Sequence, residues 1–193
     1  MKLLVLIILL IITLIIFYLI NYRSMTFLRS PIDNRYYMVR DLPDKEIAVN
    51  TLAQLRNNIL ILLNHLNMYK DTKYSDYGQY ITQLSDRITD VTVGENRESS
   101  TTTSYSVNKG EELVVCLRSR EQWNKMHNKN ILMYVILHEI AHIACPEFGH
   151  TPLFKKIFAF LTYVAVDLKL YEKIDFDNRP EEYCGIKITS SII

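Results

Sequence analysis

The chain has 193 residues, of which 49% are hydrophobic, and it carries 22 lysines and arginines against 21 aspartates and glutamates. This length fits one globular domain with a small addition and argues against two full domains. Beyond residue 23 the chain holds 20 basic and 21 acidic residues. No strongly basic domain is therefore present, and a high-affinity nucleic-acid partner is not expected.

The first segment of the chain is almost entirely apolar. Residues 1–22 contain 19 apolar residues and a single charge, Lys2. A helix over residues 3–20 would extend about 27 Å, which is close to the hydrocarbon thickness of a bilayer. A cleavable signal peptide is the main alternative, but residues 21–25 offer no small-residue cleavage site. We therefore expect residues 1–22 to be a retained transmembrane anchor whose residues 3–20 contact a lipid bilayer.

Basic residues around this segment predict its orientation. Arginines follow it at positions 23, 29, 35 and 40, whereas only Lys2 and the amino terminus precede it. The excess of positive charge on cytoplasmic loops then predicts a single-pass membrane protein whose C-terminal domain lies on the cytoplasmic side.

The remaining chain shows alternating helical and strand-like patterns. Residues 23–43 contain two prolines and are expected to be a linker that is packed on, or leads into, one domain over residues 44–193. Helices are expected over residues 44–68, 77–91, 130–144 and 151–171. Residues 94–103 are polar and loop-like, short strands are expected at 104–107 and 113–117, and residues 182–189 are strand-like. These elements predict an α+β fold of helices with a small antiparallel sheet.

The residues that carry chemistry are His138, Glu139 and His142, inside the third predicted helix. Residues four apart project from the same face of a helix, so the two imidazoles can bind one Zn²⁺. Glu139 is angled away from direct ligation, but it can reach a water on the metal and accept a proton from it. A helix with two histidines and no metal is the plain alternative.

A third ligand is expected at His150, eight residues after His142. Pro146 ends the helix, Gly149 permits a tight return of the chain, and Thr151 caps the next helix. His150 therefore occupies a fixed position. Three neutral nitrogens leave a fourth position open, as a catalytic zinc site requires.

The other residues of metal-binding type have less specific patterns. The three cysteines are an odd number and are widely spaced, which favours free thiols in a reducing compartment. Two of them remain open as a fourth ligand that would silence an enzyme, Cys145 and Cys184. Two histidines have no comparable neighbours and are expected to be surface or packing residues, His65 and His127.

These motifs resemble the WLM-type zinc metalloproteases, which are related to the SprT-like group within the zincin class. The resemblance covers about residues 104–171. It is carried first by an Asn-Lys-Gly turn at residues 108–110 and a strand ending in a Leu-Arg-x-Arg pattern at residues 114–120. The His-Glu-x-x-His helix at residues 137–142 and a Gly-His-x-x-x-Phe segment at residues 149–154 complete it. It implies a zincin-like fold in which His138, His142 and His150 bind zinc and Glu139 is the general base. The segment 182–185 also resembles membrane-anchored mini-zincins predicted in large double-stranded DNA viruses.

In zincins, an edge strand over the cleft pairs with extended substrate. Residues 114–117 are the candidate for this strand, and an ordinary sheet edge is the equal alternative. The sequence thus predicts a membrane-anchored zinc metallopeptidase that acts on a protein or peptide substrate, in a host or virion membrane if the protein is viral. Two alternatives remain: a non-catalytic membrane or virion structural protein with a zinc site, and a zinc amidohydrolase acting on a non-protein substrate.

Overall fold

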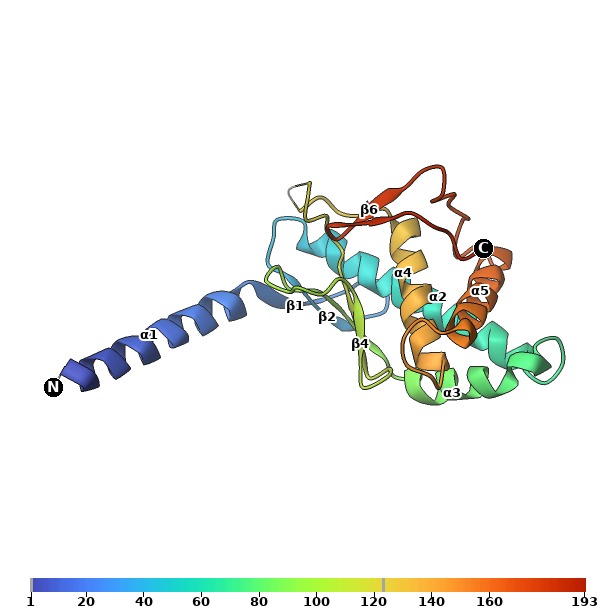
Figure 1. The fold of residues 1–193 in the computed structure, drawn as a ribbon, viewed down its shortest axis with the longest axis horizontal. Helices are drawn as coiled ribbons and strands as arrows, with labels where there is room; N and C mark the ends of the chain where they lie inside the picture. The colour runs from blue at the N-terminus through green and yellow to red at the C-terminus, as the bar shows by residue number, and fades with distance from the viewer. Residues whose placement is uncertain (1, 123) are drawn as a thin grey trace.

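A computed structural model describes residues 2–122 and 124–193. For residues 2 and 19–23 it describes the backbone only. Figure 1 shows one long helix standing apart from a body in which all other elements gather. The body combines helices with small sheets, as the sequence predicts. The elements are, in chain order, α1 (Lys2–Arg23), β1 (Met25–Arg29), β2 (Tyr36–Arg40), α2 (Lys45–Tyr69), η1 (Ser75–Tyr77), α3 (Gly78–Ile88), β3 (Thr92–Glu95), β4 (Tyr105–Val107), β5 (Glu112–Val115), α4 (Lys129–Ala144), α5 (Pro152–Asp167), β6 (Glu181–Tyr183) and β7 (Ile186–Ile188).

The apolar N-terminal segment forms α1, and its side chains at positions 3–18 are exposed. Within the part of the chain that the structure describes, no helix is long and apolar enough to cross a membrane. This finding contradicts the predicted transmembrane anchor and, with it, the single-pass membrane localisation and its cytoplasmic C-terminal domain.

The helix α4 lies at the centre of the body and packs against α2, α3 and α5. Its side chains from residue 131 to residue 144 are buried, except for those of His138 and His142. This burial explains why the segment lacks the polar stripe of a surface helix. The four predicted helices are confirmed as α2, α3, α4 and α5, with α5 ending at Asp167 rather than near residue 171.

The sheet beside α4 differs from the predicted antiparallel one. Its strand order is β3-β5-β4, and β3 pairs with β5 in parallel while β4 pairs with β5 antiparallel. The segment after β3 carries the chain to the far side of β5, which makes β3 and β5 run the same way. The candidate edge strand at residues 114–117 is therefore wrong, because β5 is the middle strand and β3 and β4 are the outer strands.

The expected linker at residues 23–43 contains a two-stranded antiparallel sheet of β1 and β2. The side chains of Tyr37 and Val39 are 2% and 0% exposed, and β2 contacts both α2 and β3. Their alternation along β2 places one face of this strand in the core. Residues 25–40 thus belong to the body of the domain.

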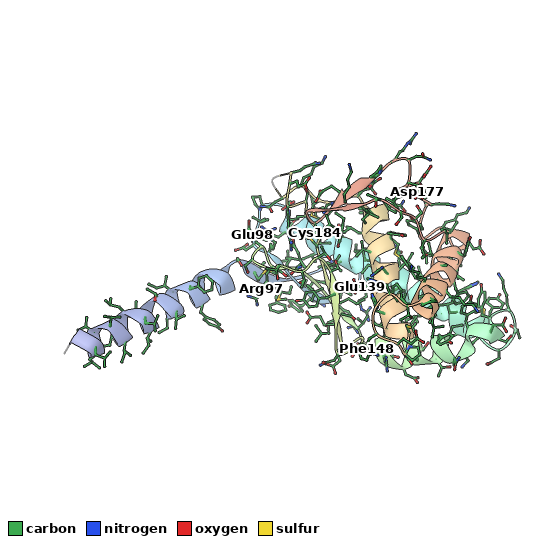
Figure 2. All side chains as sticks on the ribbon, in the orientation of Figure 1. Arg97, Glu98, Glu139, Phe148, Asp177 and Cys184 are labelled. Atoms are coloured by element: carbon green, nitrogen blue, oxygen red, sulfur yellow. A yellow bond between two sulfur atoms is a disulfide. The ribbon has the colours of Figure 1, made fainter. Side chains whose placement is uncertain are left out.

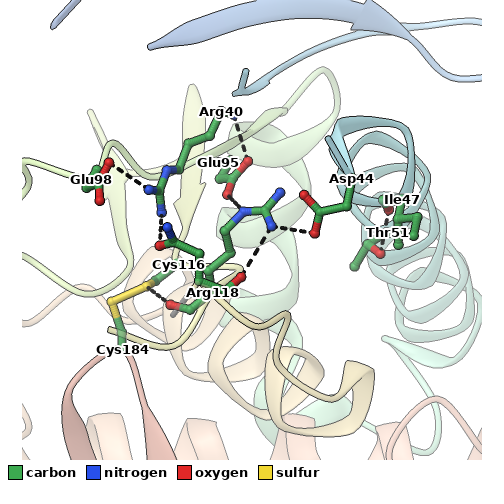
Figure 3. Close-up of polar contacts among 10 residues, drawn as sticks. Arg40, Asp44, Ile47, Thr51, Glu95, Glu98, Cys116, Arg118 and Cys184 are labelled. Atoms are coloured by element: carbon green, nitrogen blue, oxygen red, sulfur yellow. Dashed lines mark hydrogen bonds and ion pairs between the residues drawn. A yellow bond between two sulfur atoms is a disulfide. The ribbon is translucent and has the colours of Figure 1, made fainter. Parts of the chain in front are cut away.

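Buried charges join this hairpin to the central sheet (Figure 3). The Glu95 carboxylate accepts hydrogen bonds from the Arg40 backbone N–H at 2.8 Å and from Arg118 Nε at 2.7 Å. Arg118 also pairs with Asp44 at the start of α2, at 2.5 Å. Because a buried charge is costly unless it is paired, this network fixes the chain just beyond β5. The first two residues of the predicted loop at 94–103, Gly94 and Glu95, are instead the buried end of β3.

The prediction of three free thiols is wrong. Cys116 and Cys184 form a disulfide with Cα atoms 6.0 Å apart across 68 residues of sequence, and Cys145 is free and buried. The bond ties the end of the central sheet to the C-terminal hairpin of β6 and β7, which pair with each other rather than extending that sheet. Widely spaced cysteines can meet through tertiary folding, which spacing alone does not reveal.

Candidate metal site

The helix α4 places His138 and His142 on one face, and both are partly buried. Their Nε2 atoms lie 3.1 Å apart. Glu139 projects beside them and is 9% exposed. Figure 2 shows Glu139 in the middle of the body, below Cys184 in that view. The arrangement follows from the four-residue spacing of the histidines on a helix.

The turn after α4 returns His150 to the same point. Cys145 ends the helix with an extended backbone, at ψ 128°. Gly149 then adopts φ +80°, which a glycine reaches without strain. The Thr151 side chain accepts a hydrogen bond from the Phe154 backbone N–H at 3.2 Å and so caps α5. His150 Nε2 thereby lies 3.2 Å from His142 Nε2 and 3.1 Å from His138 Nε2.

The three Nε2 atoms form a nearly equilateral triangle, and no other described His, Cys, Asp or Glu joins their group. A tetrahedral Zn²⁺ bound at about 2.0–2.1 Å to each nitrogen would separate the nitrogens by about 3.3 Å. The observed separations are close to this value. Three neutral imidazoles aimed at one point are a donor set that suits a divalent transition metal. The residues therefore fit a metal ion.

An aromatic ring from α5 supports the three imidazoles. Phe154 stacks on His142 with ring centroids 4.1 Å apart, and its centroid lies 5.1 Å from that of His138 and 5.0 Å from that of His150. Phe158 also contacts His138, at 5.2 Å. Because these contacts limit rotation of the rings, the donor atoms are held in position before a metal binds.

Burial changes the acidity of the site. Desolvation, with smaller repulsion from the neighbouring histidines, lowers the pKa of His138 to about 3 and that of His142 to about 4. Both rings are thus neutral near pH 7, as metal ligation requires. Desolvation raises the pKa of Glu139 to about 7. A bound cation would favour the carboxylate form of this residue.

A cavity of about 500 Å³ opens beside the histidines and includes Glu139 in its wall. Its lining also includes residues of the C-terminal tail, none of which the sequence predicted as part of a site: Tyr183, Ile186, Ile188, Ser190, Ser191 and Ile192. Tyr183 is 1% exposed and shares a hydrogen bond with Ser104. The resemblance at residues 182–185 gave none of these tail residues a role in a site, because only the disulfide and other distant contacts bring the tail here.

The remaining candidates lie elsewhere. Cys184 is in the disulfide and cannot offer a thiolate, and Cys145 lies outside the histidine group. His65 contacts the Tyr74 hydroxyl at 3.0 Å, in keeping with a packing role. His127 Nε2 accepts a hydrogen bond from the Cys184 backbone N–H at 3.1 Å. This histidine therefore helps to hold the tail.

Comparison with known proteins gives viral relatives. Uncharacterized protein R325 of Acanthamoeba polyphaga mimivirus is 42% identical over 168 residues, which cover 87% of this chain and 84% of that protein. Uncharacterized protein 136R of Invertebrate iridescent virus 6 is 37% identical over 71 residues, 36% of this chain and 39% of that protein. Uncharacterized protein 042R of Invertebrate iridescent virus 3 is 36% identical over 69 residues, 36% and 42% of the two chains. These matches support the predicted viral character.

No family model matches the chain. Among solved structures, that of Wss1 from Saccharomyces cerevisiae is similar, with a TM-score of 0.48 and 17% identity, over 68% of this chain and 88% of that one. A likeness of this extent assigns no activity.

Proposed function

We propose that this chain, which belongs to the same family as protein R325 of Acanthamoeba polyphaga mimivirus, is a zinc-dependent metallopeptidase. The observation that carries the proposal is the convergence of His138, His142 and His150 on one point, with the Glu139 carboxyl group next to them in an open cavity. A purely structural metal site would need neither the adjoining base nor the access.

Each residue then has a chemical task. His138, His142 and His150 would hold Zn²⁺, which supplies a Lewis acid that polarises the scissile carbonyl and acidifies water. Glu139 would accept the proton of the attacking water and deliver it to the leaving nitrogen. Glu139 is only 9% exposed, which limits competing solvent around this proton transfer.

The edge strand β4 is the proposed support for the substrate backbone. It lies at the free side of the β3-β5-β4 sheet and contacts α4, and Thr103, just before it, lines the cavity. An extended peptide can add to such an edge through backbone hydrogen bonds. This placement replaces the earlier candidate at residues 114–117.

The test is Glu139→Gln in the full chain, with zinc content and peptide hydrolysis measured together. The variant keeps nearly the same side-chain volume but loses the base, so hydrolysis should fall by about 10²–10⁴-fold at unchanged zinc occupancy. Glu147→Gln is the matched control, because Glu147 is exposed in the turn after α4 and outside the cavity. It should leave both quantities unchanged.

Two results would contradict the proposal. One is a Glu139→Gln protein that binds zinc normally and hydrolyses peptides at the wild-type rate. The other is a wild-type protein that holds zinc at a 1:1 ratio, unfolds when the metal is chelated and cleaves no peptide, as a structural zinc site would.

A further inference from the structure

We propose that the cavity beside Glu139 is the subsite for a large apolar side chain of the substrate, and that the C-terminal tail forms the wall that selects it. This inference rests on the proposed peptidase function and names its substrate class: peptides with a bulky aliphatic or aromatic residue next to the scissile bond.

The lining of the cavity is the first argument. Val135 and Phe158 line the helical side, and Ile186, Ile188 and Ile192 line the side of the tail. At about 500 Å³ the cavity has the size of a small-molecule site and could receive a large side chain. His138, Glu139 and His150 also line this cavity, so a side chain bound in it would belong to a residue near the bond under attack.

The charges around the cavity also favour an apolar group. Among the described residues that line it, Glu139 is the only carboxylate and Lys155 the only lysine or arginine. Lys155 is exposed, so its ammonium can remain in water while its stem packs on the wall. An acidic side chain is the competing occupant of the cavity, and a peptide with Asp at the variable position tests it.

The tail is built as a wall, with tethers at both ends. At its start, the Cys116–Cys184 disulfide and the Tyr183–Ser104 hydrogen bond fix β6. At its end, the Ile192 backbone N–H donates to the Tyr134 hydroxyl at 3.1 Å.

Further contacts support the region between these tethers. The Ser191 hydroxyl donates to the Ile174 carbonyl at 2.6 Å. Ile186 and Ile188 are two residues apart on β7, so they share the face that meets the cavity.

Because the tail is fixed in this way, the substrate side chain meets a preformed surface. Binding then costs little ordering of the protein, and selectivity follows the fit of the side chain. Burial of a phenylalanine side chain in place of alanine should strengthen binding by about tenfold or more. An added bulky residue at position 188 should abolish that advantage because it occupies the same space.

Two measurements on the full chain test this. The first is the affinity of metal-free protein for labelled peptides that differ only at one central position, occupied by Phe, Leu, Ala or Asp. We expect Phe and Leu to bind about tenfold more tightly than Ala and Asp. The second is the residue preference at the cleavage sites of the zinc-loaded protein in a mixed peptide library, where large apolar residues should be enriched beside the cut.

Ile188→Trp should reduce the Phe-to-Ala ratio to about one in both measurements. Ile47→Trp is the matched control, because Ile47 is 59% exposed on α2 and lies outside the cavity. Ile188→Ala, which enlarges the cavity, should raise the preference for Phe over Leu, and it keeps the test valid if the tryptophan variant does not fold.

Equal binding of all peptides, tightest binding of Asp, or an unchanged ratio in both Ile188 variants would overturn the subsite. Selective binding to metal-free protein without any cleavage by the zinc-loaded protein would instead overturn the peptidase function and leave the apolar site standing.

Discussion

The two sides of the cavity are held in different ways. On one side, α4 is buried along residues 131–144 except at its two histidines, and α5 presents Phe154 to the imidazoles. On the other side, the tail is held at separate points by a disulfide and by side-chain hydrogen bonds. His138 and His142 thus rest on continuous core packing, whereas the tail, which is the proposed selecting wall, rests on a few tethers.

This difference has a consequence for how each side responds to change. The backbone of a packed helix becomes exposed mainly when the whole domain unfolds, whereas a segment with few buried contacts can unfold locally. The tail can therefore be altered with little effect on the imidazole triangle.

Replacement of a ligand should have the largest effect. His150→Ala removes one of three converging nitrogens, and zinc affinity should fall by about two orders of magnitude or more. The fold should persist, because His150 is exposed and lies in a turn. His65→Ala is the control and should not change zinc affinity. Competition with a chromophoric chelator measures the zinc affinity of both variants. An unchanged affinity in His150→Ala would show that His150 is not the third ligand.

Loss of the disulfide should have the next largest effect. The bond closes a loop across 68 residues, and its removal by Cys116→Ser with Cys184→Ser should lower the free energy of unfolding by about 2–4 kcal/mol. Urea denaturation with and without reductant measures this, since reduced wild type should match the double variant. Hydrogen exchange should show the loss of protection in residues 181–192 while α4 in the folded protein stays protected. Equal loss of protection in residues 181–192 and in α4 would contradict the independence of the tail from the helical side.

The helical side could be predicted from the sequence because its determinants are local. The four-residue spacing fixes His138 and His142 on one face of α4, and Pro146, Gly149 and Thr151 fix the return of His150 within one turn. Each of these signals acts over a few residues, where backbone preferences dominate. The same reasoning placed the helices α2 and α3 to within a few residues.

The other side could not be predicted, because its determinants are separated along the chain. The parallel pairing of β3 with β5 depends on where the intervening residues cross, and three cysteines allow several pairings or none. The burial of Tyr37 depends on α2 and β3, so residues 23–43 looked like a linker. Apolar content likewise predicted a transmembrane anchor, whereas no described helix is found that could span a membrane.

The smallest predicted effect concerns His127, which joins the tail to the rest of the domain. Its Nε2 accepts the Cys184 backbone N–H, and only a neutral ring can do so. Desolvation lowers the pKa of His127 below its usual value of 6.5, against smaller opposing effects of Glu182 and of the Arg118 backbone. The unfolded chain therefore takes up this proton first as the pH falls. The stability that the neutral ring contributes is present above about pH 6.5 and is lost on acidification.

His127→Gln provides the measurement, because glutamine can accept the same hydrogen bond and does not titrate. In metal-free protein the wild type should lose more unfolding free energy than the variant between pH 7.5 and 5.5, by about 1 kcal/mol, the net value of one such bond. His138 and His142 titrate in both proteins, so the difference between the two isolates His127. If both proteins lose stability in parallel, the His127 bond does not secure the tail, and the disulfide with the Tyr183–Ser104 contact must hold β6 without it.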